Sequence, residues 1–372
     1  MTRRVSLGRQ HGRLAYETAA GWADRESNQA MRPETIFRIA SQTKALTSVA
    51  VMQLVEAGKL TLNDRVSRYL PSFERTTVAT VTDTGVAILP AKRAITIKDL
   101  LTHTAGISYG TERQVAEAYR AKGLGPAAGF GWYTADKDEP ICETMERLGT
   151  LPFVHQPGEA WVYGYNTDIL GCVVERASGM PLDVYFERHI TGPLGMRDTH
   201  FFLPPPDRER LAAVYSVGSN GKLARAAEGA RGQGHYVEGP RRSFAGGAGL
   251  LSTARDYGRL LEALANGGSL DGAQILSPRS VELMISNQSG TLFPGEGSGF
   301  GLGFQVTERM GAGGGFSSPG SFAWGGAYHS SYLVDPALDL IILVMTQHLP
   351  APGLDLTNRI QTMVYGALEV RP

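Results

Sequence analysis

The chain has 372 residues, of which 42% are hydrophobic and 19% are charged, a composition typical of a globular protein with a substantial core. The 36 lysines and arginines balance 36 aspartates and glutamates, and no basic run stands out, so the composition favours neither nucleic acid nor an anionic membrane as a partner. Residues 1–13 contain no apolar signal-peptide core, and the longest apolar run, 340–346, has the length of a strand. We therefore expect a cytoplasmic protein.

The first part of the chain predicts a hairpin and a buried helix. Two short strands flank a His-Gly turn within residues 4–24. A helix that is apolar on almost all sides follows Ser41, and such a helix belongs in a core. Small strands are expected over residues 78–97, and Thr96 has the pattern of an N-cap residue at the start of another helix.

The second part predicts helices followed by a sheet. Apolar periodicity indicates helices over residues 168–178 and 253–265. From Phe300 onward the pattern is β, and a final helix is expected from about 356 to 368. Strands at both ends of the chain with helices between them favour an α+β fold, in which helices flank an antiparallel sheet.

We expect one α/β region built from residues 1–75 and 240–372, and a mainly helical region with small strands over 76–239. The two cysteines, Cys142 and Cys172, form no disulfide framework and are predicted to be buried free thiols. The eight histidines are scattered, and no zinc or nucleotide-binding motif occurs. No metal and no cofactor are therefore predicted.

Ser41 and Lys44 are the first candidates for catalysis. They are three residues apart, so a helix places both on one face with their Cβ atoms about 5–6 Å apart. The start of a helix favours developing negative charge at Ser41. A lysine held out of water is suited to accept the proton of a neighbouring hydroxyl. Alternatively, Ser41 is an N-cap and Lys44 extends to solvent.

The residues around this pair resemble a known superfamily. FRIASQTK, VEAGKLTLNDRVSRYLP and ITIKDLLTHTAGI are similar to segments of serine β-lactamases and penicillin-binding proteins, and most of all to class C β-lactamases and family VIII carboxylesterases. The resemblance extends from about residue 4 to 368. It implies the β-lactamase/transpeptidase-like fold, with Ser41 as nucleophile and Lys44 as the accompanying lysine. Relatives usually carry a helix before the first strand, so we expect that the start site is truncated.

The resemblance also identifies a tyrosine. The family's Y-x-N motif follows a Pro-Gly pair, and the corresponding segment here, PGEAWVYGYN, places its tyrosine at Tyr163. A phenol beside an ammonium can act as base towards Ser41 and as acid towards the leaving group. Tyr165 occupies the asparagine position, where relatives bind the acylamino group of a penicillin or peptide. This departure favours an ester substrate.

The family's K-T-G motif is absent, and Trp324-Gly325-Gly326-Ala327 occupies its place. A tryptophan cannot pair with a β-lactam carboxylate but offers apolar surface, and the W-G-G form resembles family VIII esterases. The N–H groups of Ser41 and Ala327 would then form the oxyanion hole. Trp324, Gly325, Gly326, Tyr165 and Tyr328 are the expected substrate-binding residues.

Ser108 is a competing nucleophile, because GISYG matches the G-x-S-x-G elbow of α/β-hydrolases and His103 is close in sequence. That elbow needs a preceding strand, whereas a helix is expected here. His329 is interpreted as a residue of the pocket rim or of the structure. The segment Gly246–Thr253 resembles a family segment near the site, and its backbone is expected to line the pocket.

The sequence therefore predicts a serine carboxylesterase that hydrolyses short-to-medium acyl esters through a Ser41 acyl-enzyme. Acyl transfer by the same acyl-enzyme, β-lactamase or D-peptidase activity, and a sensor that stays acylated are the alternatives. The expected partner is a small ester, and the sequence does not indicate an oligomeric state.

Overall fold

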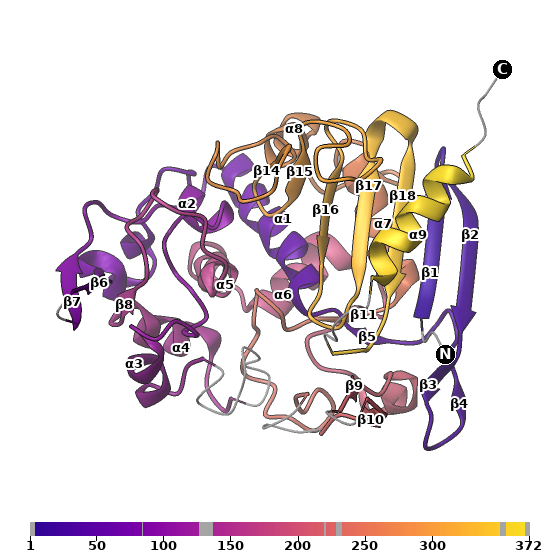
Figure 1. Ribbon diagram of the computed structural model, residues 1–372, viewed down its shortest axis with the longest axis horizontal. Helices are drawn as coiled ribbons and strands as arrows, with labels where there is room; N and C mark the ends of the chain where they lie inside the picture. The colour runs from indigo at the N-terminus through magenta and orange to yellow at the C-terminus, as the bar shows by residue number, and fades with distance from the viewer. Residues whose placement is uncertain are drawn as a thin grey trace.

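The computed structural model describes residues 4–83, 85–125, 137–218, 221–227, 233–349 and 355–368. Within these ranges the main feature is a seven-stranded antiparallel sheet with the order β14-β15-β16-β17-β18-β1-β2 (Figure 1). Its strands come from both ends of the chain: β1 (Arg4–Gln10), β2 (Arg13–Ala20), β14 (Ser298–Phe300), β15 (Gln305–Thr307), β16 (Phe322–Gly325), β17 (Ser331–Asp335) and β18 (Leu340–Met345). The predicted α+β class and antiparallel sheet are confirmed.

The pairing of β1 with β18 joins the two ends of the chain. Val5 lies opposite Met345 and Leu7 opposite Leu343, and all four side chains are buried. The turn between β1 and β2 contains His11, with a φ of 52°, and Gly12, with a φ of 66°. Two successive residues with positive φ are typical of a tight hairpin turn, so the predicted His-Gly turn is confirmed.

Helices cover both faces of the sheet (Figure 1). On one face α7 contacts β1, β17 and β18, and on the other α9 packs Ile360 and Val364 against Leu333, Leu340 and Ile342. The described α-helices are α1 (Thr43–Glu56), α2 (Ile97–Leu101), α3 (Ala116–Ala121), α4 (Ile141–Gly149), α5 (Asn166–Ser178), α6 (Leu182–Phe186), α7 (Ala254–Ala265), α8 (Pro278–Met284) and α9 (Leu356–Gly366).

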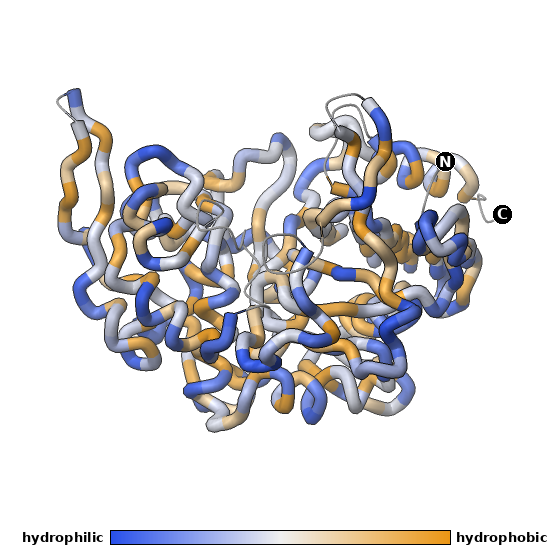
Figure 2. Tube along the Cα trace, turned by 90° about the horizontal axis from the view of Figure 1, so that it is seen from below, coloured by the Kyte–Doolittle hydropathy of each residue, from blue (hydrophilic) through white to orange (hydrophobic). Residues whose placement is uncertain are grey.

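The remaining strands form small sheets. A three-stranded sheet of order β7-β6-β8 includes a hairpin that projects from one end of the molecule (Figure 2). The hairpin exposes four large apolar side chains, those of Val81, Val86, Ile88 and Leu89. The strands of the small sheets are β3 (Trp22–Asp24), β4 (Gln29–Ala30), β5 (Phe37–Arg38), β6 (Thr77–Thr82), β7 (Gly85–Pro90), β8 (Pro152–Phe153), β9 (Tyr215–Val217), β10 (Leu223–Arg225), β11 (Leu251–Ser252), β12 (Ser269–Leu270) and β13 (Ala273–Gln274).

The helix predicted after Ser41 is α1, and it is buried on almost all sides. Only Gln53, Val55 and Glu56 are partly or fully exposed, and the helix packs against α5. Its all-round apolar pattern matches this central position. None of the helices in the described ranges has the length and apolar composition needed to cross a bilayer.

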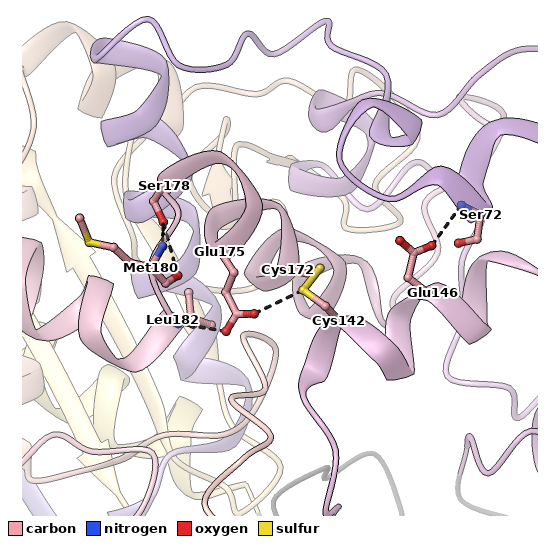
Figure 3. Close-up of a disulfide and its surroundings, with 8 residues drawn as sticks. All are labelled: Ser72, Cys142, Glu146, Cys172, Glu175, Ser178, Met180 and Leu182. Atoms are coloured by element: carbon pink, nitrogen blue, oxygen red, sulfur yellow. Dashed lines mark hydrogen bonds between the residues drawn. A yellow bond between two sulfur atoms is a disulfide. The ribbon is translucent and has the colours of Figure 1, made fainter.

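The prediction of two free thiols was wrong, because Cys142 and Cys172 form a disulfide. The bond links α4 to α5, and the Glu175 carboxylate lies 3.3 Å from the Cys142 sulfur (Figure 3). Two cysteines 30 residues apart do not reveal in sequence that their helices pack side by side. The apolar environment that suggested a buried thiol also surrounds a buried disulfide.

Breaking this disulfide should lower the free energy of unfolding. Closing a loop of this length stabilises a fold by about 3–4 kcal/mol in the chain-entropy account. Reduction should therefore lower the urea concentration at which half of the protein is unfolded. Urea titrations followed by circular dichroism, with and without dithiothreitol, measure the shift. The double variant Cys142→Ser/Cys172→Ser is the control and should not respond to the reductant. Equal midpoints for the oxidised and reduced wild type would contradict the expected stabilisation.

Candidate active site

Ser41 lies in a single 3₁₀ turn, Ala40–Gln42, directly before α1. Ala40 has a φ of 46°, an uncommon backbone conformation for a residue with a Cβ atom. Such strain is found where the surrounding structure fixes a functional residue. The turn leaves Ser41 partly exposed on the wall of a cavity, while Lys44 follows in the first turn of α1.

The Lys44 side chain is 1% exposed, and its ammonium is fully hydrogen-bonded. Lys44 Nζ donates to Gly247 O at 2.8 Å, to Tyr109 Oη at 3.1 Å and to Ser41 Oγ at 3.3 Å. An ammonium has three N–H groups, so these contacts use all of them. The contact between Lys44 and Ser41 that the spacing predicted is therefore present, and the alternative of a lysine extending to solvent is excluded.

Two tyrosines lie beside the ammonium. Lys44 Nζ is 4.6 Å from the centre of the Tyr163 ring, and Tyr163 Oη accepts a hydrogen bond from Trp324 Nε1 at 3.1 Å. The phenol hydrogen-bonded to Lys44 is that of Tyr109, whose ring packs edge-on against Tyr163. Tyr109 was not among the predicted site residues. The signal was its position next to Ser108, inside a segment that was considered only as a nucleophile elbow.

The segment that replaces K-T-G begins at the point where β16 is no longer paired with β15. β15 pairs only with Phe322 and Ala323 of β16, so the backbone from Trp324 onward has no neighbouring strand on that side. A Cβ atom on Gly326 would lie 2.5 Å from Ile39 O, which requires glycine at this close approach to the turn of Ser41.

The two expected oxyanion donors border the same cavity. Ser41 lines the cavity, and its N–H is one of the first backbone N–H groups of a helical turn, which have no acceptor within the helix. Within the described residues, Ala327 N donates no hydrogen bond to a backbone carbonyl of a turn or loop, and Ala327 lines the cavity. Both amides are therefore available to a ligand atom.

The cavity has a volume of about 700 Å³. Its described lining contains no lysine, arginine, aspartate or glutamate. The part of the lining around Ser41 includes Tyr109, Tyr163, Trp324, Gly325, Gly326, Ala327 and His329. The rest of the lining has hydroxyl, amide and small side chains that include Gln305, Thr307, Ser331, Thr357, Asn358 and Gln361. The arrangement suits an uncharged ligand.

Two of the expected substrate-binding residues do not reach this cavity. Tyr165 is buried, its Oη accepts a hydrogen bond from Gly125 N at 2.9 Å, and burial raises its pKa. Tyr328 is also buried and donates to Gln233 Oε1 at 2.6 Å. Both side chains are buried, and each hydroxyl group has its hydrogen-bond partner inside the protein: the Gly125 backbone for Tyr165 and the Gln233 side chain for Tyr328. Trp324, Gly325 and Gly326 do line the cavity.

Ser108 is not placed as a nucleophile. It is buried, donates to the Glu112 carboxylate and accepts a hydrogen bond from Gly110 N. His103 lies instead beside Asn166, with Nδ1 2.9 Å from the Asn166 amide nitrogen. Burial, together with the charge of Lys44, holds the pKa of His103 well below its usual range. Among the described residues, no group of three or more histidine, cysteine or acidic side chains is placed to hold a metal.

Known proteins are similar to this chain over most of its length. The family model described as Beta-lactamase matches residues 7–365. Esterase EstB of Burkholderia gladioli is 34% identical over 355 residues, covering 92% of this chain and 85% of EstB. Monacolin J acid methylbutanoyltransferase of Aspergillus terreus is 30% identical over 365 residues, covering 90% and 83% of the two chains.

A solved structure is also similar throughout. EstCE1, described as a hydrolase with promiscuous acyltransferase activity, superposes with a TM-score of 0.79 at 29% identity, covering 98% of this chain and 93% of EstCE1. Together with the matches above, this similarity shows that the chain belongs to the Beta-lactamase family of serine hydrolases and, within it, is similar to the family VIII esterases.

Proposed function

We propose that the protein is a serine carboxylesterase for uncharged esters with short-to-medium acyl chains. The observation that carries the proposal is the Ser41–Lys44 contact at the wall of a cavity whose described lining has no charged side chain. The similarity to EstB, which is named an esterase, supports the reaction type.

In the proposed mechanism, one member of the Lys44–Tyr163 pair is unprotonated before the reaction, and Ser41 Oγ attacks the ester carbonyl while its proton passes to that member. A bond forms between Oγ and the acyl carbon, and the N–H groups of Ser41 and Ala327 stabilise the oxyanion. The bond to the alcohol then breaks, and the alcohol leaves with the proton returned through Tyr163. Water hydrolyses the acyl-enzyme with the help of the same pair. Tyr109 would hold Lys44 in place through its 3.1 Å hydrogen bond.

Trp324 supports ester rather than β-lactam substrates. It lines the cavity where relatives of the lactam-binding type carry a lysine, and its indole N–H is bonded to Tyr163. An anionic lactam would find no ion-pair partner along the described lining of the cavity. We therefore expect weak β-lactam turnover at most.

Acyl transfer is the second candidate function. A cavity of about 700 Å³ lies in the middle of the range for sites that hold drug-sized ligands, so an acceptor alcohol has room beside a short acyl group. The named activities of EstCE1 and of the methylbutanoyltransferase support this candidate.

The expected cytoplasmic location stays a prediction. The Cys142–Cys172 disulfide weighs against it, because structural disulfides are rare in reducing compartments. Fractionation of the source cells would decide the location.

Replacing the nucleophile tests the proposal first. Wild type should hydrolyse p-nitrophenyl acetate and butyrate readily and nitrocefin barely, and Ser41→Ala should lose at least about a thousandfold in kcat because no covalent intermediate can form. Release of p-nitrophenol measures the rate, and p-nitrophenyl octanoate adds a measure of chain-length preference. Ser108→Ala is the matched control and should keep the activity. Retained activity in Ser41→Ala would refute the assignment.

The two tyrosines should differ in effect. Tyr163→Phe removes the proposed proton carrier and should lower kcat by about 10²–10⁴-fold. Tyr109→Phe removes one hydrogen bond to Lys44 and should cost about tenfold or less. Steady-state hydrolysis of p-nitrophenyl butyrate compares them. The reverse order of effects would assign the proton transfer to Tyr109.

Partitioning of the acyl-enzyme tests the second candidate. With p-nitrophenyl butyrate and added 1-butanol, an acyltransferase should form butyl butyrate in competition with butyrate, because both products come from one intermediate. Gas chromatography of the products gives their ratio, and Ser41→Ala should form neither. Butyrate as the sole product at high alcohol concentration would limit the enzyme to hydrolysis.

A further inference from the structure

Asp168 is a buried carboxylate in the first turn of α5 with no role in the mechanism above. Its side chain is 1% exposed, and Oδ1 accepts a hydrogen bond from Gly247 N at 3.0 Å. The carbonyl of the same Gly247 accepts the hydrogen bond of 2.8 Å from Lys44 Nζ. A single backbone residue therefore connects the carboxylate to the ammonium.

Gly247 allows this close approach because it has no side chain. A Cβ atom at this position would lie 2.4 Å from Asp168 Oδ2. The preceding residue is held on both sides: Thr47 Oγ1 of α1 donates to Gly246 O at 2.7 Å, and a Cβ on Gly246 would lie 2.8 Å from Thr167 O of α5. The Gly246-Gly247 backbone is thus fixed between the two helices that carry Lys44 and Asp168.

We propose that Asp168 is a positioning residue for catalysis, which fixes Lys44 through the backbone of Gly247 and balances the positive charge of the ammonium while the proton of Ser41 is in transit. The proposal rests on the proposed function, because it assumes that Ser41 and Lys44 react together. The reaction separates charge, with the oxyanion on one side and the ammonium on the other, so a fixed anion behind Lys44 favours the transition state.

The surroundings of Asp168 support this role. Within the described residues no ion pair involves its carboxylate, and the cation whose charge acts on it is Lys44. Burial raises the pKa of Asp168 to about 6, although Lys44 and the Gly247 amide act to lower it. An ionised carboxylate is costly at such a site, and a neutral side chain would fill the space at lower cost.

The ionisable groups around Asp168 and Lys44 are His103 and the phenols of Tyr109, Tyr163 and Tyr165, of which Tyr109 and Tyr163 contact Lys44. Lys44 faces Asp168 from α1, and Tyr165 precedes it at the start of α5, where the carboxylate contributes to the raised pKa of the phenol. His103 faces Lys44 from the segment after α2 and has a lowered pKa, so it is neutral at neutral pH. The ionised form of Asp168 is the active one. The acylation rate should therefore be full above about pH 6 and fall as the pH drops through that value.

The variant Asp168→Asn tests the charge, because an amide keeps the size and an oxygen that accepts from Gly247 N. Single-turnover acylation by p-nitrophenyl butyrate should slow by about 10- to 100-fold with an unchanged KM, and the loss of rate near pH 6 should disappear. The melting temperature at neutral pH should not fall, since a costly buried charge has been removed. A purely structural role would instead lower the melting temperature and leave the pH dependence as in wild type.

A second variant and a matched control make the test specific. Gly247→Ala keeps the carboxylate but displaces it, and should also slow acylation. Asp256→Asn is the control: Asp256 in α7 is buried with a raised pKa, and accepts from Asp198 N and the Thr199 hydroxyl. Its replacement should leave the acylation rate and pH dependence unchanged.

Labelling of Ser41 with a fluorophosphonate separates the two possible failures. If Ser41 is not labelled and Ser41→Ala stays active, the proposed function fails. If Ser41 is labelled but Asp168→Asn acylates at the wild-type rate with the wild-type pH profile, this inference alone is overturned. If neither Asp168→Asn nor Gly247→Ala folds, the pH dependence of acylation by the wild type tests the inference. A step near pH 6 that persists in His329→Gln supports the inference, and the absence of such a step overturns it.

Discussion

The buried ammonium of Lys44 is the constraint on which the site depends. A charge taken out of water is tolerated only when its hydrogen bonds are satisfied. Its three acceptors come from separate segments: the turn before α1, the loop after α2 and the segment that leads to β11. Each segment must be in place before the lysine can be buried. The packing of the helices and the geometry around Ser41 are therefore set together.

The sheet supplies the other wall of the cavity. Because β15 stops pairing after Ala323, the end of β16 is open towards Ser41, and Gly326, directly after β16, allows the backbone to pass close to Ile39. The same strand carries Trp324, which contacts the phenol of Tyr163. The residue that replaces a cation of lactam-binding relatives therefore also fixes a candidate proton carrier. In the proposed mechanism, Trp324 would thus couple substrate choice to catalysis.

Local patterns predicted the parts of this structure that depend on near neighbours. Four such features depend only on residues close in sequence, and each is confirmed: the Ser41–Lys44 contact, the His-Gly turn, the Thr96 cap and the apolar run of β18. Tyr109, the partner of Cys142 and the inward positions of Tyr165 and Tyr328 depend on contacts between distant elements. Single-sequence periodicity contains no information about such contacts. The division into two regions, the oxyanion donors and the ester partner stay predictions.

The position of β1 between β2 and β18 has a consequence for biosynthesis. The β1–β2 hairpin leaves the ribosome long before β18, which follows it much later in the chain. Until then one edge of β1 has no partner, and an open edge can pair with another nascent chain. Pairing with β18 removes this open edge. The yield of folded protein should therefore depend on how well the edge of β1 is protected until β18 has been made.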